Sequence, residues 1–188
     1  MKFFSFCLAF FLVNLSILSQ KNQSTIFLRN GDTLECLAKI KNNGEIKIID
    51  GSGKKKTLNH RTVKRIEHGQ GWGTGNYEYK IAIGKNIPLL LEIISEGRLT
   101  VYGQKISTSG GAGLAGGTIM ELFVGREGEN TVTDFHEPNR AFASASKELA
   151  IEYFSDCPGL IEKIRNKEIK PSEIDNMAEY YNSECSNK

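Results

Sequence analysis

The chain has 188 residues, of which 39% are hydrophobic and 24% charged, and this composition excludes a disordered or fibrous protein. Its net charge of +2 is divided unevenly: residues 21–102 hold 14 basic and 8 acidic side chains, and residues 103–188 hold 9 basic and 14 acidic ones. A nucleic-acid-binding protein would need a net basic footprint, so the balance also argues against that class.

A short apolar segment begins the chain. Lys2 precedes an apolar run over residues 3–13 (FFSFCLAFFLV), and this layout predicts a secretory signal peptide, cleaved after Ser19. The alternative is a membrane anchor, but a spanning helix needs about 20 apolar residues and the segment 3–18 is shorter and contains Asn14. We therefore expect an exported protein, which is periplasmic, outer-membrane-associated or extracellular.

Strand patterns follow one another over residues 20–135, which we expect to form one β domain. β-branched and aromatic residues alternate with polar ones, and Asn-Gly and Asp-Gly pairs mark tight turns. The aliphatic run 87–94 predicts a central strand. The expected strands are 24–29, 33–40, 45–49, 56–58, 63–67, 77–83, 89–95, 98–102 and 118–124.

Helical spacing replaces alternation over residues 136–188. Apolar residues recur every three or four positions, and Pro158 and Pro171 stand where the first turn of a helix tolerates proline. The expected helices are 139–155, 158–167 and 171–184. The predicted fold class is therefore α+β: an antiparallel sheet of seven to nine strands, curled or forming a partial barrel, with two or three short helices packed on it.

Cysteine usage agrees with export. Cys7 leaves with the signal peptide, and the remaining cysteines enter a compartment where disulfides persist. Cys157 and Cys185 flank two expected helices, so we predict a disulfide between them, worth about 3–4 kcal/mol. Cys36 is then left over, either as a buried thiol on a strand or as a reactive or intermolecular cysteine.

Several segments carry a resemblance. They are the Asn-Gly-Asp-Thr turn at 30–33, the Gly-x-Leu-x-x-Tyr segment at 97–102, and the tail with Asp-Cys-Pro at 156–158, Tyr-Asn at 181–182 and Cys185. This layout resembles a family of exported proteins from Bacteroidetes-type bacteria. The resemblance implies a secreted or periplasmic location and a β-plus-helical fold, and it carries no activity. The glycine loop 109–117 departs from the family, in which a tyrosine-rich polar stretch is commoner.

Two segments are candidates for binding. Lys54, Lys55, Lys56, Arg61, Lys64 and Arg65 lie within twelve positions and could form an anion-binding patch, or a solvated hairpin whose lysines protect an edge strand. Trp72 stands in a glycine-rich loop near Tyr77 and Tyr79. These rings could stack on sugars, or they could close one end of the sheet.

Other motifs predict no chemistry. Residues 111–116 spell G-x-G-x-x-G, but a strand is expected next, where a nucleotide site needs a helix. His60, His68 and His136 show no metal-ligand spacing, and no G-x-S-x-G elbow is present. We therefore expect no cofactor, no metal and no nucleic-acid partner. The leading hypothesis is a non-enzymatic binding or structural protein of the cell envelope; the alternatives are a glycan or envelope-polymer binding module using the Trp72 loop, and then a hydrolase.

Overall fold

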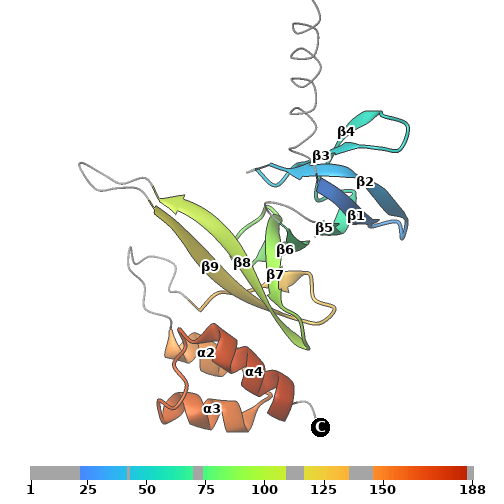
Figure 1. Cartoon of the computed structure of the whole chain (residues 1–188). Coiled ribbons are helices and arrows are strands. Elements are labelled where there is room, and N and C mark those ends of the chain that lie inside the picture. The colour runs from blue at the N-terminus through green and yellow to red at the C-terminus, as the bar shows by residue number, and fades with distance from the viewer. Residues whose placement is uncertain (1–21, 42, 70–73, 109–116, 136–145, 186–188) are drawn as a thin grey trace, which may run out of the picture. The chain divides into compact units, whose positions relative to one another are not determined.

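The computed structural model of the chain describes residues 22–41, 43–69, 74–108, 117–135 and 146–185 (Figure 1). Contacts between residues divide the chain into two units, Met1–Tyr77 and Glu78–Lys188. Both units contain strands, and the second also carries the helices. The expected signal peptide lies outside the described residues, as does Trp72.

The first unit is an antiparallel sheet in the order β4-β3-β2-β1-β5. Its strands are β1 (Asn22–Leu28), β2 (Thr33–Ile40), β3 (Ile46–Ile49), β4 (Lys55–Leu58) and β5 (Val63–His68). Gly31 makes the β1–β2 turn with φ 94°, a left-handed conformation that glycine adopts without strain. The expected Asn-Gly hairpin is therefore present.

The connection from β4 to β5 requires this sheet to curl. The two strands stand at opposite ends of the order, about 19 Å apart if the sheet were flat. Only residues 59–62 join them, and these form a tight turn in which the N–H of Val63 donates to the carbonyl oxygen of Asn59 at 2.9 Å. One face of the curled sheet is buried, and it includes Ile26, Ala38, Ile46, Ile48 and Ile66.

The second unit contains β6 (Gly75–Ala82), most of which belongs to it, β7 (Leu89–Ser95), β8 (Leu99–Thr108), β9 (Gly117–Arg126) and β10 (Thr131–Val132). The first four follow the order β6-β7-β8-β9, so the aliphatic strand β7 is central, as expected. β10 pairs in parallel with β6, and Thr133 forms a bridge to Val124 of β9. Residues 131–133 thus contact both outer strands of this order, β6 and β9.

Each face of this second sheet has its own core. Side chains alternate between the faces, so neighbouring residues of β8 enter different clusters. One cluster is enclosed by β10 and contains Ala82, Leu91, Tyr102, Phe123 and Val132. The other lies under the helices and includes Leu99, Val101, Val124, Phe135, Phe154, Leu160, Met177 and Tyr181.

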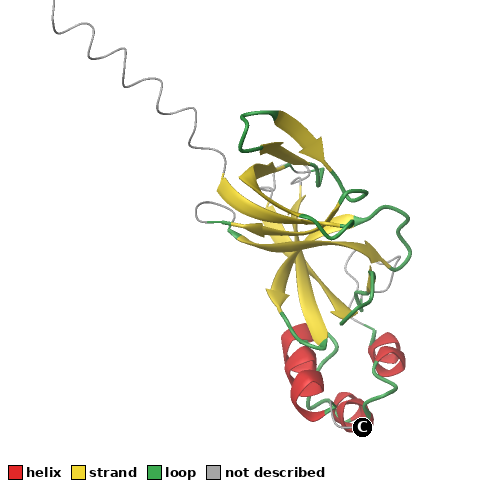
Figure 2. Ribbon diagram, turned by 90° about the vertical axis from the view of Figure 1, so that its right-hand side faces the viewer, coloured by secondary structure: helices red, strands yellow, loops and turns green. Residues whose placement is uncertain are grey.

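Three helices cover one end of this second sheet (Figure 2): α2 (Lys147–Tyr153), α3 (Pro158–Arg165) and α4 (Ile174–Glu184). α2 begins at Lys147 because Ser146 is extended and its hydroxyl caps the N–H of Leu149 at 3.3 Å. The predicted disulfide between Cys157 and Cys185 is confirmed, with Cα atoms 5.5 Å apart.

The predicted fold class is confirmed. The part of the chain that the structure describes is α+β, with ten mostly antiparallel strands followed by three short helices. Among the described residues, no helix combines the length and the apolar character that a membrane crossing requires.

Candidate functional site

Three lysines lie on the outer face of the first unit's sheet, which we call the lysine face: Lys39 of β2, Lys47 of β3 and Lys55 of β4. Buried isoleucines occupy alternate positions of β3, so Lys47 between them must point away from the core. Lys39 and Lys47 are direct cross-strand partners. Lys55 follows on the next strand, diagonal to Lys47, which pairs with Thr57.

The pairing of Lys39 with Lys47 has an electrostatic cost. Directly opposite side chains on neighbouring strands have Cβ atoms about 5 Å apart, and like charges there destabilise a sheet. Lysines on an edge strand prevent unwanted pairing, which accounts for Lys55 on β4. This reason does not extend to β2 and β3, each of which has strands on both sides.

The structure divides the predicted anion patch. Lys54 and Lys56 flank Lys55, and Lys56 forms an ion pair with Asp50 at 3.2 Å. Hydrogen bonds, chiefly from the Ser52 hydroxyl, lower the pKa of Asp50 to about 2, so this carboxylate stays charged beside the lysines.

The other predicted cations follow β4 in the chain. Arg61 lies in the β4–β5 turn, and Lys64 and Arg65 lie on β5, where Arg65 pairs with Glu67 at 3.6 Å. Of the predicted set, Lys55 is the residue that lies next to Lys47 on the outer face. Lys39 and Lys47 were missed because they are distant in sequence, although their alternation with isoleucines was a usable signal.

The predicted sugar platform is described only in part. Tyr77 is half-buried, and Tyr79 is 5% exposed, so the ring of Tyr79 offers no open face to a ligand. Trp72 lies outside the described residues, and its role stays a prediction.

A closed set of hydrogen bonds surrounds His68 on the buried side of the first unit. The Ser24 hydroxyl donates to the Asn22 carbonyl at 3.0 Å and lies 2.7 Å from Nδ1 of His68. Because the hydroxyl proton of Ser24 is used in the bond to Asn22, Nδ1 of His68 must carry a hydrogen and donate it to the Ser24 oxygen. Nε2 of His68 is then unprotonated and can accept from the side-chain amide of Asn22 at 3.3 Å. The arrangement suits a neutral imidazole, and burial lowers the pKa of His68 accordingly. Ser24 is 3% exposed and is not a nucleophile here.

The remaining sequence candidates are the cysteine thiol, the metal ligands and the glycine-rich motif, and the described residues form no reactive or metal-binding site from them. Cys36 pairs with Ser24 across β1 and β2, is buried, and forms no disulfide; burial, followed by the charge of Asp50, raises the pKa of its thiol. The described residues contain no group of three or more metal-ligating side chains. The G-x-G-x-x-G segment and His136 lie outside them, and the segment after that motif is strand β9, as expected.

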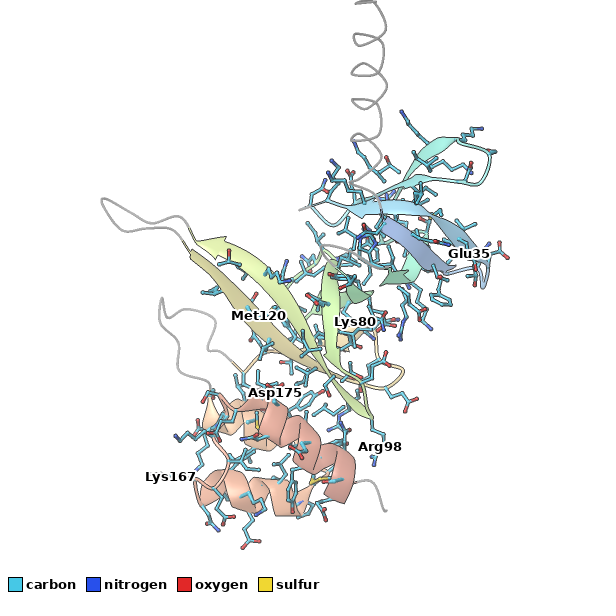
Figure 3. The ribbon with its side chains drawn as sticks, in the orientation of Figure 1. Glu35, Lys80, Arg98, Met120, Lys167 and Asp175 are labelled. Carbon is cyan, nitrogen blue, oxygen red and sulfur yellow. A yellow bond between two sulfur atoms is a disulfide. The ribbon has the colours of Figure 1, made fainter. Side chains whose placement is uncertain are left out.

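A buried ion pair fixes the β9–β10 turn. Lys80 is 7% exposed; its Nζ lies 3.1 Å from Glu78 and donates to the carbonyl oxygen of Glu129 at 2.6 Å (Figure 3). The hydroxyl of Tyr102 donates to the same Glu78 carboxylate at 3.0 Å. Burial, and then this charge, raises the pKa of Tyr102. Because every charge has a partner, the cluster serves structure.

Two of the segments that carry the resemblance, 97–102 and 181–182, meet between α4 and β8. The Asn182 side chain accepts from the N–H of Leu99 at 2.8 Å and donates to its carbonyl oxygen at 2.9 Å. A Cβ on Gly97 would overlap that amide, so glycine is required there. These segments therefore attach α4 to the sheet.

A second attachment is centred on Arg126 of β9. Its guanidinium makes two hydrogen bonds to Asp156, at 2.6 and 2.8 Å, and lies between the rings of Tyr153 and Tyr181. The hydroxyl of Tyr181 also donates to Asp156, at 2.6 Å. These hydrogen bonds, with that of Arg126 first, hold the pKa of Asp156 well below its ordinary value. Asp156 precedes the disulfide-bonded Cys157, so the Asp-Cys-Pro tail is structural too.

One groove of about 580 Å³ lies beside α4, and it is wide open. It is lined by Ser95, Asp175, Glu179, Asn182 and Ser183. The Asn182 side chain is already hydrogen-bonded to Leu99, and the carboxylates of Asp175 and Glu179 are exposed. These lining residues therefore form no preformed binding site.

Comparison with known proteins adds no family. The chain matches no protein-family model, no curated protein and no solved structure.

Proposed function

We propose that this protein is a non-enzymatic exported protein that binds an anionic polymer of the cell envelope, such as an acidic glycan, through the lysine face. The observation that carries the proposal is the direct pairing of Lys39 with Lys47 on two interior strands. Together with Lys55 on the next strand they place three ammonium groups on one face of the sheet, and a ligand with regularly spaced negative charges would match them.

The charge of the surrounding segment supports the same partner. Residues 21–77, which belong to the first unit, carry 11 basic and 5 acidic side chains, an excess of six positive charges. Lys47, Lys54, Lys55 and Lys56 are all exposed, so a long anion could reach beyond the lysine face along β4. An extended polymer suits this open outer surface better than a small ligand does, because a small ligand needs a concave site.

Retention on immobilised heparin, with uncharged dextran as the blank resin, tests the proposal. The wild-type mature protein should bind heparin at low salt and elute as salt rises, because screening weakens exposed charge contacts. Replacing Lys39, Lys47 and Lys55 together by Gln should weaken binding by about tenfold or more. The slope of log affinity against log salt should fall by about one for each lysine removed.

A charge-matched variant separates a site from net charge. Lys85, Lys167 and Lys170 are exposed on the second unit, and their joint replacement by Gln changes the net charge equally. This control should keep wild-type affinity. Equal losses in the two triple variants, or no retention of the wild type, would reject the lysine face as a binding site.

A further inference from the structure

Apart from Thr133 at Val124, the described residues provide no backbone partner for the outer edge of β9. All ten of its residues pair with β8, from Gly117 to Arg126. On its other side the described residues supply only Thr133, which exchanges hydrogen bonds of 2.8 and 2.9 Å with Val124. Backbone groups of alternate residues point to the same side of a strand, so Thr118, Met120 and Leu122 point outward like Val124. We call these three residues the β9 edge; no other described residue bonds their outward groups.

Apolar side chains surround the β9 edge. Ile119 is 55% exposed. Its neighbour Met120 is 41% exposed and is labelled on β9 in Figure 3. Met120 and the 45% exposed Ile94 both lie over Gly103, where a Cβ would come within 2.8 Å of the Met120 sulfur. Glycine thus lets the two side chains form one continuous apolar strip.

This edge lacks the protection that β4 has. Lysines follow one another on β4, whereas residues 117–122 (GTIMEL) contain neither Lys nor Pro, and no register shift interrupts their pairing with β8. An exposed apolar edge with free N–H and C=O groups is a template for another extended strand.

We propose that β9 pairs with β9 of a second copy of this chain, antiparallel and centred on Met120. In this register Met120 faces its own counterpart, and Thr118 faces Leu122 of the other copy. Each of these pairs exchanges two hydrogen bonds, so the whole β9 edge is used. Ile119 faces Glu121, the only charged residue of the segment, whereas a two-fold axis at residue 121 would oppose two carboxylates. The pairing uses a different unit from the lysine face and goes beyond the proposed function.

Sedimentation velocity of the mature chain, residues 20–188, over about 1–300 µM tests the pairing. The average mass should rise from monomer toward dimer. Ile119→Glu places a carboxylate opposite Glu121 twice in the dimer and should weaken association by about tenfold, whereas Ile119→Lys creates two ion pairs and should preserve or tighten it. A general loss of apolar surface would weaken both variants alike.

A backbone variant tests the hydrogen bonds. The N–H of Met120 points outward and is not bonded to β8, so Met120→Pro removes one edge donor and leaves the β8–β9 ladder intact. It should abolish the dimer while circular dichroism stays native, and the triple lysine variant should dimerise as the wild type does. A monomer at every concentration, or equal weakening by Ile119→Glu and Ile119→Lys, would overturn the proposal.

Discussion

Asn182→Ala should destabilise the second unit by more than a surface substitution can. The side chain of Asn182 satisfies both backbone groups of Leu99, at 2.8 and 2.9 Å, and Leu99 is fully buried. Two neutral hydrogen bonds contribute about 2 kcal/mol net, and leaving buried backbone groups unpaired adds to the loss. We therefore expect the unfolding free energy to fall by about 3 kcal/mol and the melting temperature by roughly 10–20 °C.

Urea unfolding followed by circular dichroism, with the disulfide intact, measures this change. Asn176→Ala is the matched control, because Asn176 is on the same helix, is exposed, and gains the same helix propensity from alanine. The control should stay within about 0.5 kcal/mol of wild type. A value for Asn182→Ala in that same range would refute the reasoning, because it would mean that water satisfies Leu99.

The acid dependence of Asn182→Asp gives an independent reading of the same contact. At pH 7 a carboxylate oxygen would replace the amide donor and face the carbonyl oxygen of Leu99. The folded state then prefers the protonated side chain, so the pKa of the new carboxyl is raised above its unfolded value of about 3.9. Relative to wild type, this variant should therefore recover stability as pH falls from 7 toward 4. A difference that is constant with pH would contradict the geometry.

Further predictions concern the other attachments. Arg126→Lys should lower the unfolding free energy by about 1–2 kcal/mol in urea, because lysine cannot make both bonds to Asp156, and the 27% and 44% exposure of the pair limits the loss. Wild-type stability should be full above about pH 6.5 and decline below it, because the unfolded state binds a proton that burial disfavours in folded His68; His68→Gln should flatten that decline between pH 7 and 5. Reduction of the disulfide should cost about 3–4 kcal/mol, and thiol titration of the denatured, unreduced protein expressed as residues 20–188 should find Cys36 alone.

Local patterns predicted most elements of the fold. The strands 33–40 and 89–95 have the bounds that alternation and turn residues indicated, because tight turns fix hairpin register without help from distant residues. β10 was missed, since two residues carry no periodicity and only their partners on β6 and β9 define them. The expected helix 139–155 begins instead at Lys147, after the cap at Ser146, and residues 136–145 lie outside the described part.

The candidate site was predictable only in part. Neighbourhood in sequence grouped Lys55 with Arg61 and Arg65, whereas the register of two hairpins places it with Lys39 and Lys47. Likewise, the resemblance singled out Gly97 and Asn182 without a reason. Their contact joins residues more than eighty positions apart, a distance at which local patterns carry no information.

The long reach of α4 also bears on how the second unit is synthesised. The sequence separation is 83 residues between Leu99 and Asn182, 55 between Arg126 and Tyr181, and 28 between Cys157 and Cys185, and in each pair the second residue is synthesised last. No ribosome-bound intermediate that lacks these late residues can close the core beneath the helices. Assembly of this unit is therefore a late event governed by slow long-range loop closure, and the core beneath the helices stays open until the last residues of α4 have been synthesised.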